Sequence, residues 1–445
     1  MKKVLLLGAG LVARPGLRYL LEKGFFVTVV DQVESKAAAL LQGHPNGRSG
    51  AWTTDDKQGL TNLIKDADLV VSLLPATFHV LIAEECIAQK KLMVTASYVS
   101  PAMRALDAKA REAGILILNE IGVDPGIDHM SAMKVIDQVK ASGGKVTSFK
   151  SYCGGLPAPD ANTNPWGYKF SWSPRGVMTA GKNSARYLKD GRQVDVPGPE
   201  LFGDMHLLNV PGLGELEAYP NRDSMSYIEI YGLREAKTVF RGTLRYKGWC
   251  AAMKKIVNSG LLDDKERDLK GLTYKEFTAA VLTGGEPAGL RADIAAKFGV
   301  PVNFHGIEWL EWLGLFGDEK LPFEKGSPLD VMVARMVEKM SYADGERDTL
   351  AMHHEFIAEY PGGRGEKLTS TLVDFGIPHG DTSMARTVSL PVAIATRLIL
   401  EGRITGAGVQ IPVSPAIYEP LLRELEENGI HFKETTVKLA AAAGK

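Results

Sequence analysis

Short runs of apolar residues alternate with helical patterns along the first 118 residues. The runs are rich in Leu, Val and Ile, as buried strands are, and they lie at 4–7, 25–30, 68–74, 92–95 and 115–118. Helical patterns lie between them, among them 78–89 and 101–111, and the second begins at a proline, which suits a first turn. This alternation predicts right-handed crossovers and a parallel sheet.

The pattern changes after residue 127. Residues 146–153 alternate like a half-buried strand, and the segment 154–159 is rich in Gly and Pro, which predicts an extended loop. Residues 248–339 are helical and charged, with two tryptophans suited to a packed face. Two alternating runs at 352–360 and 368–375 predict a β-hairpin, and a long helix is expected from Ser383 to Leu400.

These patterns predict an α/β protein of several domains, since 445 residues exceed one ordinary core. We expect a Rossmann-type dinucleotide domain, a mixed α/β substrate and dimerisation domain, and an all-helical insertion. Their bounds are 1–126 with 388–445, 127–247 with 345–387, and 248–344, respectively. The small-residue run after Lys438 is expected to fray.

The first strand runs directly into a glycine turn that opens a helix. Gly8, Gly10 and Ala13 form a G-x-G-x-x-A pattern, with Leu11 and Val12 between them. The first glycine permits the tight turn, the second lets a pyrophosphate approach the backbone, and the small third residue lets helix pack on strand. The helix N-terminus presents N–H groups to the phosphates. The turn predicts a dinucleotide site.

Asp31 ends the second strand, twenty-one residues after Gly10 (31 − 10). An acid there hydrogen-bonds the adenosine ribose of NAD and repels the 2′-phosphate of NADP. An Asp after a strand is otherwise a turn residue or a helix cap. Because it follows a well-formed glycine turn, we interpret Asp31 as a ribose ligand and expect NAD, with NADP as the alternative.

Three loops follow strands of the predicted sheet and should gather around one crevice, because ligands bind outside the carboxyl ends of parallel strands. They contain Leu74, Pro75 and Thr77, then Ser97 and Tyr98, and then the segment 119–126 with Asp124. This order places Tyr98 and Asp124 beside the nicotinamide end.

Arginines dominate the candidate substrate domain, among them Arg222, Arg241 and Arg245. A guanidinium matches a carboxylate, so a polycarboxylate substrate is indicated, although any single arginine is more often paired at the surface. The candidates for proton handling are Asp124, Tyr98 and Cys153. Asp124 could equally be a turn residue, and Cys153 a small buried apolar residue. We expect no metal, since His129 has no second His or carboxylate at helical metal spacing and the adjacent His353 and His354, on a strand pattern, face opposite sides.

Composition narrows the class of protein further. A net charge of −1 gives no reason to expect nucleic acid or an anionic membrane as partner. Three scattered cysteines make no disulfide framework, which favours a reducing cytoplasm. No apolar run approaches the roughly 20 residues of a membrane span, and the first strand breaks at Gly8, unlike a signal peptide.

Six long motifs together resemble the saccharopine dehydrogenase family of the L-glutamate-forming type, also called saccharopine reductases. They are VTASYVSPAM (94–103), NEIGVDPGIDHM (119–130), SYCGGLPAP (151–159), YKFSWSPRGV (168–177), AYPNRDS (218–224) and RGTLRYKG (241–248). The resemblance implies hydride transfer between a nicotinamide cofactor and a secondary amine or imine. Saccharopine would thereby interconvert with L-glutamate plus 2-aminoadipate 6-semialdehyde in lysine metabolism. It also implies a three-domain enzyme that is commonly a homodimer.

Carried over residue by residue, the resemblance implies a role for each motif. Ser97 and Tyr98 would lie between cofactor and substrate, and Asp124 by the reacting centre. The substrate carboxylates would be held by Arg222, Thr243, Leu244 and Arg245. The nicotinamide would be walled by Val123, Pro125 and Trp172.

One departure from the family affects the cofactor. The fungal biosynthetic members place a basic residue just after the second strand, suited to NADP, whereas here the first cation after Asp31 is Lys36. This favours NAD, as in the lysine-degrading members.

Two other functions stay open at this point. A related imine-reducing dehydrogenase could act on another amino acid–aldehyde adduct, although a polyamine would need acids where Arg222 and Arg245 stand. A non-catalytic NAD-binding regulator would keep the glycine turn, but it would have no need of the arginines, Tyr98 and Asp124.

Overall fold

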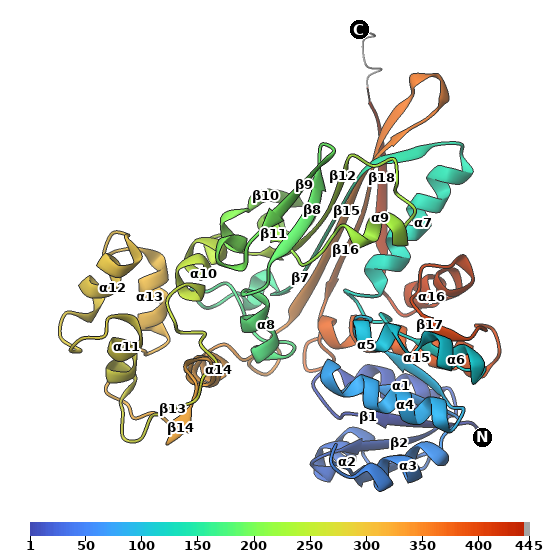
Figure 1. The fold of residues 1–445 in the computed structure, drawn as a ribbon, viewed down its shortest axis with the longest axis horizontal. Helices are drawn as coiled ribbons and strands as arrows, with labels where there is room; N and C mark the ends of the chain where they lie inside the picture. Colours follow the sequence, from blue (N-terminus) through green and yellow to red (C-terminus); the bar gives the residue numbers. More distant parts are fainter. Residues whose placement is uncertain (440–445) are drawn as a thin grey trace. The chain divides into compact units, whose positions relative to one another are not determined.

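The computed structural model describes residues 1–439, and Figure 1 shows the course of the chain. The run at 440–445, in the tail that we expected to fray, lies outside the described residues. The chain divides into two compact units. The first comprises Met1–Lys145, Tyr360–Arg364 and Gly380–Thr435, and the second Val146–Glu359, Gly365–His379 and Thr436–Lys445. The three-part division expected from the sequence stays a prediction.

The first unit is built on a seven-stranded sheet in which every pair is parallel. In spatial order its strands are β17 (Gly408–Gln410), β6 (Leu116–Leu118), β5 (Leu92–Thr95), β4 (Leu69–Ser72), β1 (Lys3–Leu7), β2 (Phe26–Asp31) and β3 (Gly47–Ala51). The strand order reverses between β1 and β4. Ligands of doubly wound sheets bind at such a switch point, so the α/β, Rossmann-type prediction for this region is confirmed.

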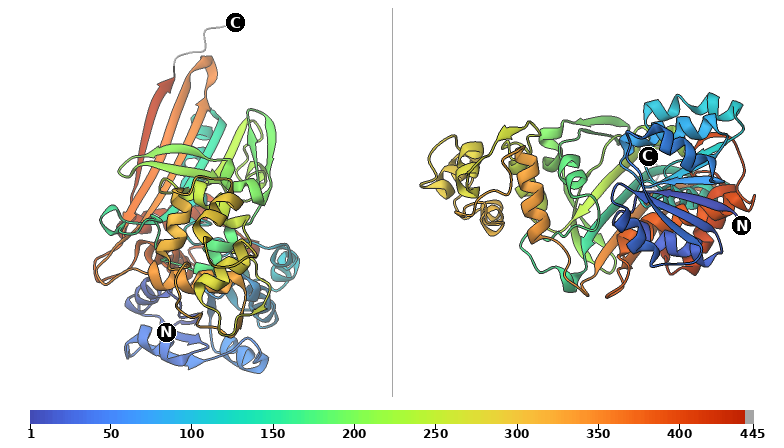
Figure 2. Two further views of the ribbon diagram at one scale, coloured as in Figure 1. Left: turned by 90° about the vertical axis from the view of Figure 1, so that its left-hand side faces the viewer. Right: turned by 90° about the horizontal axis from the view of Figure 1, so that it is seen from below.

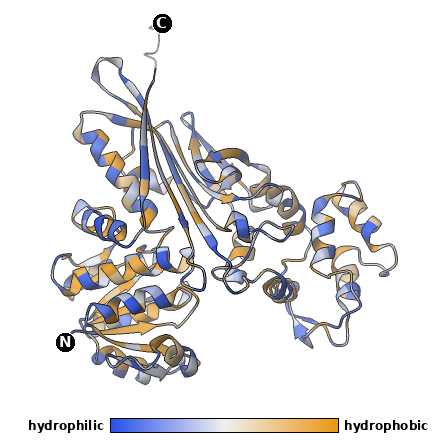
Figure 3. Cartoon of the chain, turned by 180° about the vertical axis from the view of Figure 1, so that it is seen from behind, coloured by the Kyte–Doolittle hydropathy of each residue, from blue (hydrophilic) through white to orange (hydrophobic). Residues whose placement is uncertain are grey.

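The strands are nearly all apolar, and amphipathic helices flank them (Figure 3). The helices of this unit are α1 (Ala13–Glu22), α2 (Glu34–Leu41), α3 (Lys57–Lys65), α4 (His79–Ala88), α5 (Pro101–Arg104), α6 (Asp107–Glu112), α7 (Ile127–Ala141), α15 (Ser383–Leu400) and α16 (Pro415–Glu427). Helices α1 and α15 approach closely at Gly16, whose N–H donates to the Ser389 hydroxyl at 2.9 Å. A Cβ at Gly16 would lie 2.7 Å from the Ser389 carbonyl oxygen, so this contact requires glycine.

Helix α15 is long and apolar enough to cross a membrane by length and composition alone, which our expectation from apolar runs overlooked. Its 18-residue window is 78% buried inside the structure. A mostly buried core helix passes the same test, so this feature is weak support for a membrane span.

The second unit contains a nine-stranded sheet, of which seven strands follow one path. In order they are β10 (His206–Val210), β11 (Gly214–Pro220), β12 (Thr238–Arg245), β7 (Lys145–Pro157), β15 (Asp348–Glu359), β16 (Gly365–Phe375) and β18 (Phe432–Leu439). Two more strands, β8 (Ala185–Lys189) and β9 (Arg192–Val196), form a hairpin against β12. Strands β12 and β7 are parallel, whereas β10–β11, β11–β12 and the predicted hairpin β15–β16 are antiparallel.

Helices gather at one end of the second unit, seen in yellow and orange in both views of Figure 2. They are α10 (Trp249–Val257), α11 (Tyr274–Leu282), α12 (Leu290–Phe298), α13 (His305–Trp312) and α14 (Pro328–Lys339), with the small pair β13 (Arg267–Asp268) and β14 (Lys325–Gly326). Two shorter helices lie between strands of the sheet in the sequence. Helix α8 (Pro174–Ala180) follows β7, and helix α9 (Ser226–Ile230) follows β11.

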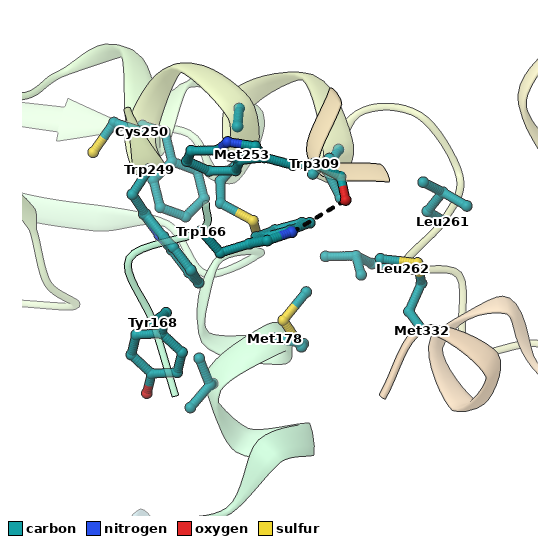
Figure 4. Close-up of a cluster of buried hydrophobic side chains, with 14 of the residues drawn as sticks. Trp166, Tyr168, Met178, Trp249, Cys250, Met253, Leu261, Leu262, Trp309 and Met332 are labelled. Carbon is teal, nitrogen blue, oxygen red and sulfur yellow. Dashed lines mark hydrogen bonds between the residues drawn. The ribbon is translucent and has the colours of Figure 1, made fainter. Parts of the chain in front are cut away.

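Aromatic side chains join these helices to the rest of the second unit (Figure 4). The indole N–H of Trp166 donates to the Trp309 carbonyl at 3.2 Å, and the two ring centroids lie 5.0 Å apart. Trp249 packs 5.0 Å from Tyr168 and 6.2 Å from Trp166. The cluster therefore packs against the segment around residue 168 and against the helix that follows β12.

Three local predictions differ from the structure. The helix expected at 101–111 is two helices, α5 and α6, and the Asp107 carboxylate at the second start accepts the Val409 N–H at 2.7 Å. Strand β7 continues to Pro157 where a loop was expected, since Gly154 allows close approach to Leu244. The half-exposed edge strand β3 was not predicted, because GRSGA shows no apolar pattern.

Candidate functional site

The glycine turn of the first unit has an open, uncapped helix N-terminus. Gly8 has φ +102°, and a Cβ there would lie 3.2 Å from the Leu73 backbone. A Cβ at Gly10 would meet nothing within 4 Å, so this glycine faces open space. The N-terminus of α1 receives no side-chain cap at Val12. Leu11 is exposed beside it. These features fit the pyrophosphate of a dinucleotide, which N–H groups at a helix start attract.

The loop after β4 lies against this turn. The Leu73 N–H donates to the Leu7 carbonyl at 2.9 Å, and a Cβ at Gly8 would lie 3.5 Å from the Leu74 side chain. Pro75 precedes a short 3₁₀ turn, η1 (Ala76–Phe78), which contains Thr77. The structure therefore brings Gly8 and Leu74 together, as the order of strands predicts, and the roles of Pro75 and Thr77 stay predictions.

Asp31 makes its hydrogen bonds within the turn. One carboxylate oxygen accepts the Ala9 N–H at 2.9 Å, and the other accepts the Val33 N–H at 3.1 Å. The carboxylate thus ties the end of β2 to the glycine turn, as an Asx-turn residue does. Arg14, beside the turn, is also engaged: it donates to the buried carboxylate of Asp381 at 2.6 Å.

Tyr98 and Asp124 meet in the first unit. The Tyr98 hydroxyl donates to an Asp124 carboxylate oxygen at 2.9 Å. Both side chains are partly exposed at the carboxyl ends of β5 and β6. A phenol bonded to a carboxylate can carry or relay a proton, so this pair suits acid–base chemistry.

Glu120 braces the segment 97–99, which we call the 97–99 loop. The Glu120 N–H donates to the Ser97 carbonyl at 3.1 Å, and its carboxylate accepts the Val99 N–H at 2.9 Å. The other carboxylate oxygen lies 2.7 Å from the His129 imidazole, which is fully buried. Glu120 has φ +55°, unusual for a residue with a side chain. The backbone on both sides of Tyr98 is therefore held by one residue.

The turn between Asp124 and α7 is equally constrained. The Asp124–Pro125 peptide is cis, and the Gly122 N–H donates to the Pro125 carbonyl at 2.9 Å. Gly126 has φ +147°, and a Cβ there would lie 2.1 Å from the Gly122 carbonyl oxygen. Val123 is buried in this turn. The segment that presents Asp124 therefore depends on glycine at 126.

Arg245 is the most distinctive group of the second unit. Its side chain is 5% exposed and lies between two rings, with the guanidinium carbon 4.9 Å from the Tyr168 centroid and 5.3 Å from that of Trp249. One N–H donates to the Leu244 carbonyl at 2.7 Å, while Nε has no partner. A buried guanidinium with an unused donor is costly unless an anion binds it. Arg245 therefore fits a carboxylate receptor.

Thr243 and Leu244, both predicted site residues, directly precede Arg245 in β12. Thr243 pairs with Cys153 across the parallel β12–β7 contact, and Cys153 is 9% exposed. The Leu244 side chain is fully buried, so only its backbone could meet a ligand. Trp172 is partly buried and packs against the aromatic cluster.

Arg222 lies away from Arg245. Glu217 pairs with Arg245, whereas Arg222 lies beyond the end of β11, next to Asn221, whose N–H donates to the Arg241 carbonyl at 2.8 Å. Arg222 has φ +54°, and it lines a cavity of about 400 Å³ with Arg186, Asp195 and Asp223. Arg241 is buried and donates to the Tyr227 hydroxyl at 2.7 Å, which is a structural contact.

Sequence reasoning missed several residues of this arrangement: His79, Glu120, His129, Tyr168 and Trp249. Glu120 and His129 had a usable signal because they stand within the same motif as Asp124, and Tyr168 had one because it begins the motif that contains Trp172. In the described part of the chain, no group of three or more His, Cys, Asp or Glu side chains is arranged to hold a metal ion.

The chain matches two family profiles that together cover most of its length. Residues 4–118 match the saccharopine dehydrogenase NADP binding domain, and residues 122–430 match the saccharopine dehydrogenase C-terminal domain. The first profile therefore covers β1 to β6 of the parallel sheet, whereas β17 lies in the range of the second profile.

Curated relatives agree with the profiles. A saccharopine dehydrogenase [NADP(+), L-glutamate-forming] from Pyricularia oryzae is 41% identical over 98% of this chain and 99% of its own. The protein of that name from Saccharomyces cerevisiae is 42% identical with the same coverage. The mitochondrial alpha-aminoadipic semialdehyde synthase of Bos taurus is 39% identical over 98% of this chain and 48% of its own.

A solved structure agrees as well. The apo saccharopine dehydrogenase (L-Glu forming) from Saccharomyces cerevisiae superposes with a TM-score of 0.88 at 40% identity. The match covers 98% of this chain and all of that one.

The expectation of NAD as the preferred cofactor is wrong. The matching profile is an NADP binding domain, and the fungal relatives are named for NADP(+). The physical reason lies in Asp31, whose two carboxylate oxygens accept the N–H groups of Ala9 and Val33. An acid that braces the glycine turn does not report on the 2′ position of the ribose.

Proposed function

Because the chain belongs to the saccharopine dehydrogenase family, we propose that it is an NADP-dependent enzyme acting on the C–N bond of saccharopine. The family reaction interconverts saccharopine with L-glutamate and 2-aminoadipate 6-semialdehyde in lysine metabolism. The observation that carries the proposal beyond the family is Arg245, a buried guanidinium with an unused donor that a substrate carboxylate would satisfy.

The first unit holds the cofactor in this proposal. Its phosphates would meet the N–H groups at the start of α1 and the open face of Gly10, which has room for them. Leu11 and Val12, which follow β1, and Leu74, Pro75 and Thr77, which follow β4, are proposed to line the same site. The nicotinamide supplies or accepts a hydride when bound. Ser97, Val123, Pro125 and Trp172 are proposed as its neighbours.

Tyr98 and Asp124 handle the proton on nitrogen. Oxidation of a secondary amine to an imine requires the nitrogen to lose a proton, and reduction requires it to gain one. Asp124 accepts a hydrogen bond from Tyr98, so its carboxylate can take up a proton while the phenol orients it. Such groups contribute typically 10²- to 10⁴-fold to rate.

The second unit recognises the carboxylates. Arg245 is fixed between Tyr168 and Trp249 before any ligand binds, so little side-chain freedom is lost on binding. Thr243 and the Leu244 backbone lie beside it, and Arg222 would take a more distant carboxylate of a long substrate. Cys153, buried next to Thr243, shapes the site through its volume. Orientation of the reacting carbon by these contacts is worth several kcal/mol.

We further propose a location in the cytoplasm and a homodimeric state. Cys86, Cys153 and Cys250 are buried and form no disulfide, which suits a reducing cytoplasm. A homodimer follows the resemblance to the family. Sedimentation of the purified chain and the location of a tagged protein test these two statements separately from the reaction.

The deciding experiment follows absorbance of the reduced cofactor after saccharopine is mixed with NADP⁺ or NAD⁺. A rise that is faster with NADP⁺ is expected, and Arg245→Met should abolish most of it. Turnover with NAD⁺ alone would overturn the cofactor assignment. Silence with both, in a folded protein, would exclude saccharopine and leave another amino acid–aldehyde adduct or a non-catalytic role.

A further inference from the structure

A buried histidine of the first unit joins the sheet to the 97–99 loop. His79 is the first residue of α4 and is 3% exposed. Its Nδ1 lies 2.9 Å from the Ser72 hydroxyl, and its Nε2 lies 2.8 Å from the Ser97 hydroxyl. The Thr95 hydroxyl is 3.2 Å from Nε2. Three hydroxyls from three segments therefore meet one imidazole.

The sheet register explains why these groups meet. Strands β4 and β5 are parallel neighbours, and Ser72 pairs with Thr95 at their carboxyl ends. Helix α4 starts above this point, so its first side chain points across both strand ends. Ser97 follows two residues after Thr95. The imidazole thus stands at the base of the loop that carries Tyr98.

We propose that His79 is a positioning residue for the reaction, which orients the Ser97 hydroxyl and holds the 97–99 loop so that Tyr98 reaches Asp124. This inference rests on the proposed function, in which Ser97 is a neighbour of the nicotinamide. His79 touches neither cofactor nor substrate in this assignment, and it acts through Ser97.

The chemistry of a neutral imidazole suits this role. One ring nitrogen donates and the other accepts. One of the two serine hydroxyls, Ser72 or Ser97, must therefore donate to the ring while the other accepts from it. The hydrogen bond that the fully buried Ser72 makes to Nδ1 is therefore coupled, through the ring tautomer, to the one that Ser97 makes to Nε2. Burial lowers the pKa of His79 to about 4, which keeps the ring neutral near pH 7. A ring that stays neutral is suited to orienting a neighbour rather than to exchanging protons with substrate.

Two separate contacts then fix the loop. Glu120 holds its backbone through the Ser97 carbonyl and the Val99 N–H, while His79 holds the Ser97 side chain. Tyr98 stands between these anchors and donates to Asp124. Loss of the side-chain anchor leaves the backbone anchor in place, so the loop should shift rather than unfold. A shift of about 1 Å near a reacting centre can cost roughly 100-fold in rate.

The test compares His79→Gln with His79→Asn. A Gln amide reaches the place of Nε2 and can still bond Ser97, whereas an Asn amide reaches only the place of Nδ1 and Ser72. We expect His79→Gln to keep kcat/KM within about fivefold of the unaltered chain. His79→Asn should lose roughly 10- to 100-fold and should weaken NADPH binding, measured by its fluorescence.

A matched control separates positioning from folding. Cys86 is fully buried on the same helix two turns later, so Cys86→Ala disturbs α4 without touching Ser97. It should lower the melting temperature without a selective loss of kcat/KM. The double variant His79→Asn with Ser97→Ala should match Ser97→Ala alone, because the histidine acts through the serine.

Three outcomes would overturn the inference. The effects of His79→Asn and Ser97→Ala on kcat/KM could multiply in the double variant, or His79→Asn and His79→Gln could be equally active. The third is a loss of kcat/KM in His79→Asn no greater than that in Cys86→Ala when the two variants are equally stable. If the unaltered chain does not oxidise saccharopine, the proposed function fails by itself. The NADPH dissociation constants of the same variants then decide the role of His79, since Ser97 is assigned to the cofactor.

Discussion

The Tyr98 hydroxyl donates a 2.9 Å hydrogen bond to the Asp124 carboxylate, although 26 residues separate the two in the chain. Strands β5 and β6 are parallel neighbours, so the loops that follow them emerge at one edge of the sheet. The contact joins the two groups to which we assign proton transfer, and it is the basis of the first prediction.

Asp124→Asn should lower kcat by roughly 10²- to 10⁴-fold, because an amide cannot take up the proton of the amine. The pH dependence of kcat should lose the limb due to this carboxyl group. Steady-state rates across pH, with circular dichroism as a check on folding, measure both. An unchanged pH profile would move the proton role to another residue. Tyr98→Phe should cost less, since it removes only the orienting bond.

Arg245→Met should separate binding from stability. The KM for saccharopine should rise about 10- to 100-fold, since a charge-assisted hydrogen bond contributes about 1.5–3 kcal/mol. The folded state should be as stable as before or more stable, by up to about 3 kcal/mol, because the change removes a buried cation with an unused donor.

Arg241→Met is the control for that change. Arg241 is also buried, but it donates to Tyr227 and lies 4.3 Å from that ring centroid. Its replacement should lower the melting temperature with little effect on the KM of the molecules that remain folded. A rise in KM for Arg241→Met equal to that for Arg245→Met would contradict the assignment of the carboxylate to Arg245.

Gly8→Ala should lower stability, whereas Gly10→Ala should weaken cofactor binding. Gly8 has φ +102° and would place a Cβ 3.2 Å from the Leu73 backbone, so its alanine variant should be destabilised by about 1 kcal/mol or more. Gly10 faces open space, so its alanine variant should fold normally but bind NADPH more weakly. Chemical denaturation and fluorescence titration of both variants distinguish the two effects. Normal NADPH binding by Gly10→Ala would place the pyrophosphate elsewhere.

Stability should fall in acid partly because of His79. Burial lowers its pKa from 6.5 to about 4, so the unfolded chain binds a proton more readily than the folded one. The contribution is therefore fully present above pH 6.5 and is lost as the pH falls toward 4. Its size is about 3 kcal/mol at 1.36 kcal/mol per pKa unit. In His79→Gln, the free energy of unfolding should depend less on pH between 6.5 and 4. Urea titrations at several pH values measure this dependence, and the same dependence in the variant and the unaltered chain would contradict the prediction.

The sequence by itself determined the local elements with strong periodicity. Strand β5 and helix α15 have the bounds that the apolar pattern predicts, and the hairpin of β15 and β16 follows from alternation. It also determined that the loops with Gly8, Tyr98 and Asp124 share one edge, because parallel strands carry their carboxyl ends to the same side. The family resemblance, carried by long motifs, was confirmed for the same reason: motif identity needs no knowledge of contacts.

Only the tertiary structure decided what individual polar groups do. Asp31 reads as a ribose ligand in the sequence, yet its carboxylate binds the N–H groups of Ala9 and Val33. Arg241 and Arg245 stand four residues apart, and the sequence does not distinguish them. In the structure, Arg241 donates to the Tyr227 hydroxyl, whereas Nε of Arg245 has no hydrogen-bond partner. His79 carried no signal, because its partners come from β4 and from the loop after β5. A polar side chain acts through whatever lies within about 3 Å, and long-range pairing of strands sets that distance.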